Sequence, residues 1–189
     1  DSVNYAGTIE EDLSRRDFTM NAIAASLDDG SLVDPFGGQK DIKEKCIRTV
    51  GNPHDRFSED GLRPIRAIRF ATQLGFTIAP ETLDAIPASL EKTAGISVER
   101  FRDEFIKIIK SPEPSVGLKL LEETGILKIF IPELLSCKGV KQADCRGFHQ
   151  FDVLTHLYYA CDGAPAHKEL VRLAALLHDI GKPQAKRTG

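Results

Sequence analysis

The chain has 189 residues, of which 41% are hydrophobic, and this is enough apolar material for a core in one or two small domains. The formal net charge of −3 does not by itself indicate a nucleic-acid-binding protein, although residues 40–70 carry eight Lys or Arg against five Asp or Glu. Length and composition exclude a membrane-spanning apolar run and a signal peptide, so we expect a cytoplasmic protein with no membrane partner.

The N-terminal part combines one helix start with short strands. Thr8 and Glu11 match a capping box, which predicts a helix from Thr8 to about Arg15. A strand, a turn, a second strand, a helix and a third strand are expected in that order over 18–27, 28–31, 32–33, 40–45 and 47–50.

From Pro53 onward, strand signals nearly vanish and helical patterns dominate. Pro64 falls inside the first expected helix, which therefore starts near Gly61 or bends at the proline. The sequence predicts an α+β fold that is mostly α, with a small β-containing N-terminal part followed by an all-helical body. The expected helices cover 60–74, 80–90, 97–111, 114–124, 151–162 and 166–179.

The four cysteines show no C-x-x-C pair and no regular framework. Reduced thiols, mostly buried, are the expected state in a cytosolic protein. They are Cys46, Cys137, Cys145 and Cys161.

The segment Ser58–Phe70, SEDGLRPIRAIRF, places acids and arginines at helical spacing beside an apolar stripe. In a helix, Asp60, Arg63 and Ala67 fall on one face, because residues three and four apart are neighbours. A carboxylate beside a guanidinium matches the amino group and ring-nitrogen acceptor of cytosine or adenine. Uracil and guanine carry a carbonyl and a ring N–H there, so both contacts would become repulsive.

The same segment has a plainer interpretation as an exposed helix with ordinary ion pairs, which the spacing alone favours. Under the nucleotide-binding interpretation, Glu59 braces Arg63 from one turn away. Arg66 and Arg69 then continue a basic ridge toward a triphosphate, with Arg66 as a further nucleotide-binding residue.

Motifs on both sides of this segment favour the nucleotide-binding interpretation. RRDFTMNA (15–22) and DPFGG (34–38) with Asp41 lie upstream, and SVERFRDEF (97–105) and GLKLL (117–121) lie downstream. In this order and at these intervals, the chain closely resembles the class II tRNA nucleotidyltransferase and bacterial poly(A) polymerase family. The resemblance runs from about Thr8 to Leu135.

The resemblance implies roles for the first motif. Arg15 and Arg16 would contact nucleotide phosphates, and Asp17 would accept from the ribose 2′-hydroxyl. Asn21 would support the strand backbone. The structural alternative is a salt-bridged helix terminus, in which the arginines satisfy the last carbonyls.

The resemblance also implies the domain organisation. Residues 1–52 would be the remnant of a nucleotidyltransferase head, 53–135 a helical neck and body with the nucleotide-reading helix, and 136–189 the beginning of an HD-like helical domain. DPFGG would be a springy connection between head and neck. Ser97, Glu99, Arg100 and Glu104 are expected to form a capped, ion-paired helix with a structural role.

A catalytic motif of the family is missing. Nucleotidyl transfer needs carboxylates that hold two metal ions, Mg²⁺ in the intact enzyme, and in the family an Asp-x-Asp pair supplies them. The 189 residues contain no Asp-x-Asp, since Asp28 and Asp29 are adjacent and no other two aspartates lie two apart. No catalytic residue is therefore assigned. The chain opens on Asp1 and stops at Gly189 as if cut at both ends, and we expect it to be inactive alone.

The C-terminal HDIGK stretch resembles an HD-type domain. His156 lies 22 residues before His178, which Asp179 follows directly, and this order and spacing resemble the first three ligands of an HD metal site. Such ligands suit a divalent transition metal that activates water for phosphate-ester hydrolysis. The alternative is a pair of packed helix histidines in a domain without metal.

The sequence therefore predicts part of a template-independent enzyme that adds C and A, or A alone, to tRNA 3′ ends. Its substrates would be ATP and CTP and its partner the 3′ end of tRNA or another RNA, whereas the oligomeric state stays open. A bacterial poly(A) polymerase is the nearest alternative, and the HD-like stretch favours the tRNA enzyme. An HD phosphohydrolase and a non-catalytic RNA-binding module are the alternatives from other classes.

Overall fold

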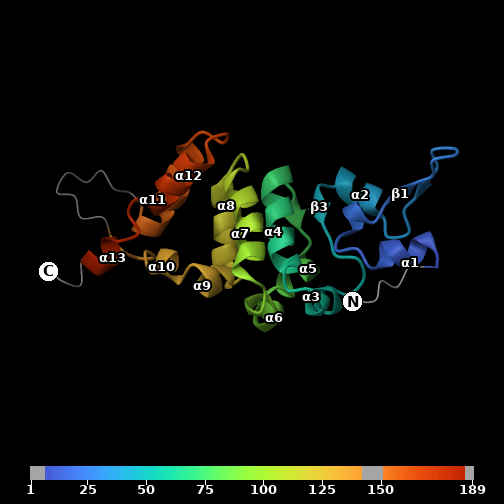
Figure 1. Cartoon of the computed structure of the whole chain (residues 1–189), viewed down its shortest axis with the longest axis horizontal. Coiled ribbons are helices and arrows are strands. Elements are labelled where there is room, and N and C mark those ends of the chain that lie inside the picture. Colours follow the sequence, from blue (N-terminus) through green and yellow to red (C-terminus); the bar gives the residue numbers. More distant parts are fainter. Residues whose placement is uncertain (1–6, 142–150, 186–189) are drawn as a thin grey trace. The chain divides into compact units, whose positions relative to one another are not determined.

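The structure is a computed structural model that describes residues 7–141 and 151–185. The chain divides into two compact units, residues 1–93 and 94–189 (Figure 1). Helices dominate both units and the described strands are two residues long, so the expected α+β class that is mostly α is confirmed.

The first unit mixes short helices with two small sheets. Strands β1 and β2 pair antiparallel, with Ala24 opposite Val33, whereas β3 and β4 pair parallel, with Ile47 opposite Ile78. In chain order its elements are α1 (Ile9–Ser14), the 3₁₀ turn η1 (Thr19–Asn21), β1 (Ala24–Ala25), β2 (Leu32–Val33), α2 (Gly38–Lys43), β3 (Cys46–Ile47), α3 (Pro53–Glu59), α4 (Arg63–Leu74), β4 (Thr77–Ile78), α5 (Pro80–Asp84), η2 (Pro87–Ser89) and α6 (Leu90–Ala94).

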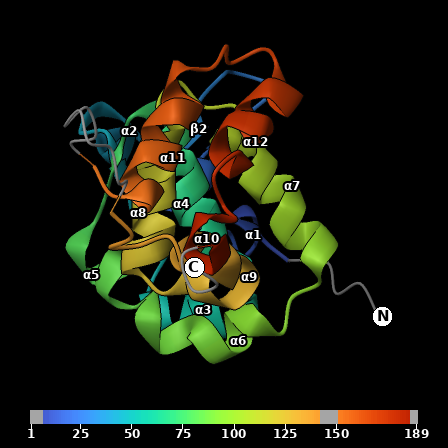
Figure 2. The same ribbon diagram turned by 90° about the vertical axis from the view of Figure 1, so that its left-hand side faces the viewer.

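The second unit is helical throughout its described residues, apart from one isolated bridge between Lys141 and Asp152. Helix α11 packs against α8, and α12 packs against α7 (Figure 2). Its helices are α7 (Val98–Ile109), α8 (Pro114–Glu123), α9 (Ile126–Phe130), α10 (Pro132–Leu135), α11 (Val153–Gly163), α12 (Glu169–Leu177) and α13 (Lys182–Ala185).

Helix α4 is the central element of the first unit. Pro64 stands in its first turn, where the missing N–H costs no hydrogen bond. Ile65, Ile68 and Ala71 follow at helical spacing and are buried. The helix ends at Gly75, whose φ of 64° is a left-handed conformation that glycine adopts without strain.

Several expected helices are confirmed with shorter bounds. Thr8 caps α1 by accepting from the Glu11 N–H, and Ser97 caps α7 in the same way through the Arg100 N–H. The Glu11 carboxylate accepts from the Gly7 N–H at 2.7 Å, one residue before the Thr8 N–H that a capping box would use.

Other expectations about secondary structure were wrong. The strand expected over 18–27 is reduced to β1, because Phe18 forms only an isolated bridge with Thr49 and residues 19–21 turn into a 3₁₀ helix. The helix expected over 80–90 breaks at Pro87, which cannot donate to the preceding turn. Strand β4 lies in the part expected to be all-helical, where its two residues complete a ladder with β3.

Among the described residues, no helix has both the length and the apolar composition needed to cross a bilayer. Cys46, Cys137 and Cys161 are free thiols, and Cys145 lies outside the described residues. Burial raises the pKa of the Cys161 thiol to about 11, so this cysteine is protonated near neutral pH.

Candidate functional site

One face of α4 carries three side chains that contact the segment 15–18. Positions 63, 66 and 70 are three and four residues apart and therefore point the same way. The contacts are Arg63 to the carbonyl of Arg15 (3.1 Å), Arg66 to the carboxylate of Asp17 (2.7 Å), and the Phe70 ring to the Phe18 ring (5.8 Å between centroids, edge-on). The helix and the arginine-rich motif thus form one polar surface.

The Arg63 guanidinium is fixed by three acceptors. Its Nη1 donates to Glu59 Oε2 at 2.6 Å and to the Arg56 carbonyl at 3.0 Å, while Nη2 donates to the Arg15 carbonyl. The side chain is only 16% exposed. The expected contact between Glu59 and Arg63 therefore exists. Because Glu59 ends α3 and Arg63 begins α4, this pair links two helices.

Arg56 is a structural neighbour of Arg63 that sequence reasoning missed. Its Nη1 donates to the Ser14 carbonyl at 3.0 Å, next to the Arg15 carbonyl that Arg63 engages. Two arginines therefore satisfy successive carbonyls at the C-terminal end of α1, where the helix leaves them without partners. Arg56 and Arg63 thus satisfy helix-end carbonyls in the way that the structural alternative expected of arginines.

Asp60 and Arg63 do not share a helix, which corrects the expectation for 60–74. Asp60 is extended, with φ −144° and ψ 113°, because it ends α3 and precedes the first turn of α4. Its Oδ1 accepts from the Leu62 N–H at 3.0 Å, and its carbonyl accepts from the Arg63 N–H. The first bond ties the carboxylate of Asp60, and the second its backbone, to the start of the helix that presents Arg63.

Gly61 is required at this junction by close packing. A Cβ added to it would lie 2.4 Å from the carbonyl oxygen of Lys92 and 2.9 Å from the Cα of Thr93. The backbone between Asp60 and Arg63 therefore lies directly against the end of α6. Any larger residue would displace one of the two.

Asp17 is held at both carboxylate oxygens. Oδ1 accepts from the Phe18 N–H at 2.9 Å and from the Asn21 side-chain amide at 3.0 Å. Oδ2 accepts from Arg66 Nε at 2.8 Å and Nη2 at 2.7 Å. Asn21 was expected to support a strand backbone, but it stands in η1 and its side chain binds Asp17 instead.

Arg15 and Arg16 are exposed at the end of α1. Arg16 pairs with Asp12 at 2.7 Å, with the two side chains 53% and 46% exposed. An ion pair this exposed contributes little to stability and is easily exchanged for another anion.

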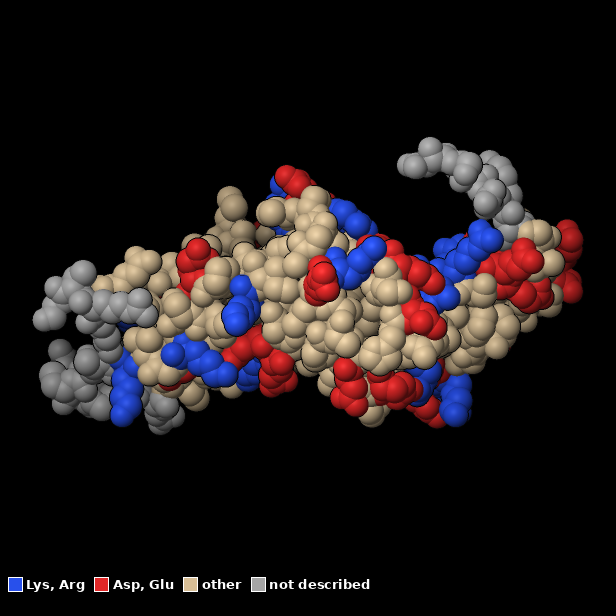
Figure 3. All heavy atoms as spheres, turned by 90° about the horizontal axis from the view of Figure 1, so that it is seen from below, with Lys and Arg blue, Asp and Glu red and all other residues tan. Residues whose placement is uncertain are grey.

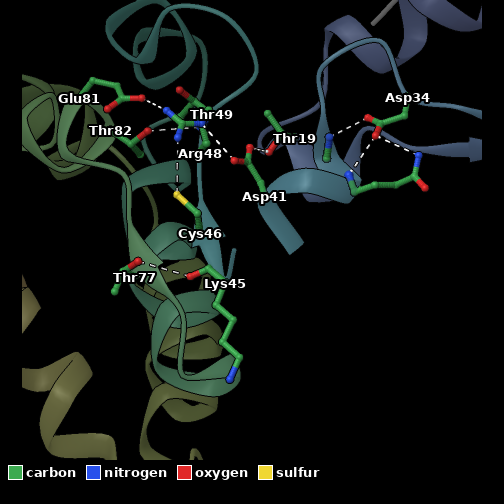
Figure 4. A network of polar contacts seen from close by, with 12 residues as sticks. Thr19, Asp34, Asp41, Lys45, Cys46, Arg48, Thr49, Thr77, Glu81 and Thr82 are labelled. Atoms are coloured by element: carbon green, nitrogen blue, oxygen red, sulfur yellow. Dashed lines mark hydrogen bonds and ion pairs between the residues drawn. The ribbon is translucent and has the colours of Figure 1, made fainter. Parts of the chain in front are cut away.

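Asp34 and Asp41 form polar contacts at helix α2 (Figure 4). Asp34 accepts from the Gly38 and Gln39 N–H groups at 2.7 and 2.9 Å, and so caps α2. Asp41 is 4% exposed, accepts from the Thr19 hydroxyl at 2.6 Å and pairs with Arg48. Arg48 also reaches Glu81, which joins α2 to α5.

The His–Asp cluster, defined as His156, His178 and Asp179, forms in the second unit. The Nε2 atoms of the two histidines lie 3.2 Å apart, and Asp179 Oδ2 lies 3.2 Å from His178 Nε2 and 3.8 Å from His156 Nε2. The backbone carbonyl of Ala175 orients the other ring nitrogen of His178 at 2.8 Å. Within the described ranges, these residues could share one metal ion.

Lys182 is a further member of this region that sequence reasoning missed. Its ammonium lies 2.6 Å from Asp179 Oδ2. Burial raises the pKa of the Asp179 carboxyl, but the hydrogen bond from Lys182 and the charges of His178 and Lys182 outweigh it, so the pKa lies below its usual value. The spacing of Asp179 and Lys182, three residues apart in HDIGK, was the available signal.

Three family models match consecutive parts of the chain. Residues 1–48 match "Poly A polymerase head domain", 75–138 match "Probable RNA and SrmB-binding site of polymerase A", and 146–188 match "HD domain".

Curated relatives and a solved structure agree with these matches. The chain is 48% identical to a CCA-adding enzyme of Geobacillus sp. (strain WCH70) over 77% of its length and 35% of the relative's. It is 41% identical to an A-adding tRNA nucleotidyltransferase of Deinococcus radiodurans over 97% of its length and 43% of the relative's. The crystal structure of the Bacillus stearothermophilus CCA-adding enzyme in complex with CTP superposes with a TM-score of 0.66 at 43% identity, covering 71% of this chain and 35% of that one. The chain therefore spans less than half the length of these proteins.

Proposed function

The chain belongs to the class II family of CCA-adding and A-adding tRNA nucleotidyltransferases, and from this premise we propose that it forms the nucleotide-reading part of such an enzyme. The substrates would be ATP and CTP, and the acceptor would be the 3′ end of tRNA. Two relatives are named as a CCA-adding enzyme and an A-adding tRNA nucleotidyltransferase, and a third was solved in complex with CTP. These names support the proposed substrates and acceptor.

The observation that carries the proposal is the fixed Arg63 guanidinium. It is held by the Arg15 carbonyl just after α1 and by the Arg56 carbonyl and the Glu59 carboxylate of α3. Arg63 is also the first residue of the helix to which Asp60 is tied. A guanidinium and a carboxylate held in this way read a base edge without a nucleic-acid template, because neither can rotate to suit uracil or guanine.

The proposed roles divide the nucleotide among its chemical parts. Arginines bind the phosphates, one carboxylate binds the sugar, and a carboxylate–guanidinium pair reads the base. The assignments are Arg15 and Arg16 for phosphate, Asp17 for the ribose 2′-hydroxyl, Asp60 for the exocyclic amino group, Arg63 for the ring nitrogen, and Glu59 and Asn21 as supports.

Asp34 and Asp41 do not fit a Mg²⁺ site for the transfer step. Asp34 is occupied by the N-terminus of α2, and Asp41 is nearly buried against Thr19 and Arg48. Neither faces a second carboxylate in these contacts. We therefore assign no metal-dependent step to this chain, and propose that Mg²⁺ chemistry requires an Asp-x-Asp pair outside these 189 residues.

The test is terminal transfer by the protein expressed from the complete gene. It is given tRNA ending before C74 or after C75, with each of ATP, CTP, UTP and GTP. A CCA-adding enzyme extends both acceptors, an A-adding enzyme extends only the second, and a poly(A) polymerase adds many A residues to either RNA. Absence of any transfer with ATP or CTP would refute the proposal.

A non-catalytic RNA-binding module is less well supported. It would need a broad basic face, whereas on the face drawn in Figure 3 acidic and basic side chains of the described residues are interspersed. Phosphate contacts dominate the affinity of such modules, so mixed charge weakens them.

A second candidate function concerns the His–Asp cluster. Two imidazoles and a carboxylate within 4.8 Å suit a divalent transition metal, and we propose that these residues hold one. Such a metal would activate water for phosphate-ester hydrolysis. Calorimetric titration of the protein with Mn²⁺ and Zn²⁺ tests this, and equal heats for the protein and its His156→Ala variant would contradict it.

A further inference from the structure

Arg66 was expected to extend a basic ridge toward a triphosphate, but its guanidinium is directed at Asp17. Both Nε and Nη2 donate to the same oxygen of that carboxylate, at 2.8 and 2.7 Å. The two residues are 49 positions apart in the sequence, so the pair links α4 to the arginine-rich motif.

The burial of this pair makes its separation costly. The Asp17 side chain is 10% exposed and that of Arg66 is 31% exposed. If Arg66 turned away to bind a phosphate, it would leave a nearly buried carboxylate without its cation, which strongly destabilises a protein. Arg16, on the exposed end of α1, can bind a phosphate without that loss.

Arg66 is itself held in place. The ring of Phe70, one turn later on α4, lies 5.4 Å from the Arg66 guanidinium carbon, and Phe70 packs edge-on against the fully buried Phe18. Adjacent residues of the motif, Asp17 and Phe18, are thus bound by side chains one turn apart on α4.

We propose that Arg66 is a positioning residue that acts through Asp17, and that it sets the preference for ribonucleotides over deoxynucleotides. This inference rests on the proposed function, in which Asp17 accepts from the ribose 2′-hydroxyl. Asn21 and the Phe18 N–H fix one oxygen of Asp17, and Arg66 fixes the other. A carboxylate held at both oxygens keeps one orientation, which discrimination between two sugars requires.

Helix α4 therefore carries both Arg63, which reads the base, and Arg66, which orients the Asp17 carboxylate toward the sugar. Arg63 and Arg66 are three residues apart on α4, and their contacts fall on Arg15 and Asp17, two residues apart in the motif. Because α4 is a single helix, a shift that moves one contact moves the other.

The experiment compares ATP with dATP as the final nucleotide added to tRNA ending in C75, using the protein from the complete gene. The measured quantity is the ratio of kcat/KM for ATP to kcat/KM for dATP. The variants are Asp17→Asn, Arg66→Met, Arg66→Lys and the double variant Asp17→Asn/Arg66→Met. Arg102→Met is the matched control, because Arg102 is 63% exposed and pairs only locally with Asp103.

We expect Arg66→Met to lower the ATP/dATP ratio about tenfold, as Asp17→Asn does, since each removes a charged hydrogen bond from the sugar contact. The double variant should be no worse than either single variant, because the two residues act as one unit. Arg66→Lys should retain most of the preference, and Arg102→Met all of it.

Two results would overturn the inference. If Arg66 bound the triphosphate, Arg66→Met would raise KM for ATP and dATP equally and leave the ratio unchanged. If Arg66 only stabilised the fold, both rates would fall together with the unfolding midpoint, again at a constant ratio. Failure of the unmodified protein to add any nucleotide would instead refute the proposed function, and with it this inference.

Discussion

The polar surface around α4 and the His–Asp cluster both gather charged side chains, but they hold them differently. Around α4, Arg63 donates to backbone carbonyls of Arg56 and Arg15, and Asp17 is only 10% exposed. In the cluster, the side chains of His156 and His178 are 36% and 44% exposed.

The two sites therefore differ in how much freedom their side chains would lose when a ligand binds. A side chain already fixed by the fold loses little further freedom when a ligand binds, and this favours selective recognition. The His–Asp cluster brings nitrogen and oxygen ligands together, with the Lys182 ammonium on the same carboxylate. A cation bound at the proposed metal site would have to compete with that ammonium for Asp179.

The polypeptide 1–189 should not catalyse nucleotidyl transfer, even though the residues proposed to recognise the nucleotide are fixed by the fold. With no Asp-x-Asp pair, the polypeptide 1–189 should incorporate no labelled ATP or CTP into tRNA with any divalent metal. Its affinity for either nucleotide is expected near or weaker than millimolar, about 4 kcal/mol. Transfer by the rigorously purified polypeptide would mean that Asp34 and Asp41 hold the metals, contrary to the contacts described for them.

Cation binding should respond in opposite directions to two changes near the His–Asp cluster. His156→Ala removes a ligand and should weaken Mn²⁺ or Zn²⁺ binding by roughly tenfold or more, about 1.4 kcal/mol. Lys182→Ala removes the ammonium that competes for Asp179 and should strengthen binding. Calorimetric titration measures both, with Lys168→Ala as the control. Weaker binding in Lys182→Ala would show that the ammonium is part of the site.

The α3–α4 junction should tolerate no added methyl group. Gly61→Ala places a Cβ against the Lys92 carbonyl and should lower the free energy of unfolding by about 1–3 kcal/mol. Gly163→Ala, where the added Cβ meets nothing within 4 Å, is the matched control and should change it by less than about 0.5 kcal/mol. If urea unfolding gave the same free-energy change for both variants, the close approach at Gly61 would make no contribution to stability.

The smallest effect is expected for Arg16. Its exposed pair with Asp12 should contribute less than about 0.5 kcal/mol, so Arg16→Ala should leave the unfolding midpoint nearly unchanged while weakening ATP binding. A clear loss of stability would return Arg16 to a purely structural role.

Local signals predicted much of the fold. The capping residues Thr8 and Ser97 gave helix starts that the structure confirms, because a side chain that satisfies an N-terminal N–H acts within one turn. The strand over 18–27 was wrong, and the helix expected over 60–74, with its start near Gly61, begins at Arg63. In both cases long-range contacts decide the structure: Phe18 pairs with Thr49, and Gly61 packs against Lys92.

The candidate site was predictable as a set of residues but not as a set of contacts. The spacing of Glu59, Arg63 and Arg66 drew attention to α4, and the Glu59–Arg63 bond exists. No local pattern indicated that Arg66 would bind Asp17, or that Arg56 and Arg63 would cap α1, because these partners are 42 to 49 residues apart. Fixed interactions of this kind follow only from the packing of α4 against residues 14–18.

Base selectivity of the Arg63→Ala variant tests the central claim most directly. The measurement is the rate of adding CTP and ATP relative to UTP and GTP to tRNA by the protein from the complete gene. Arg56→Ala serves as the control, since it also loses a contact with a carbonyl at the end of α1 but reads no base. We expect Arg63→Ala to lose about 1–3 kcal/mol of discrimination, Asp60→Asn less, and Arg56→Ala none. Unchanged selectivity in Arg63→Ala, at full activity, would contradict the claim that this surface selects the nucleotide.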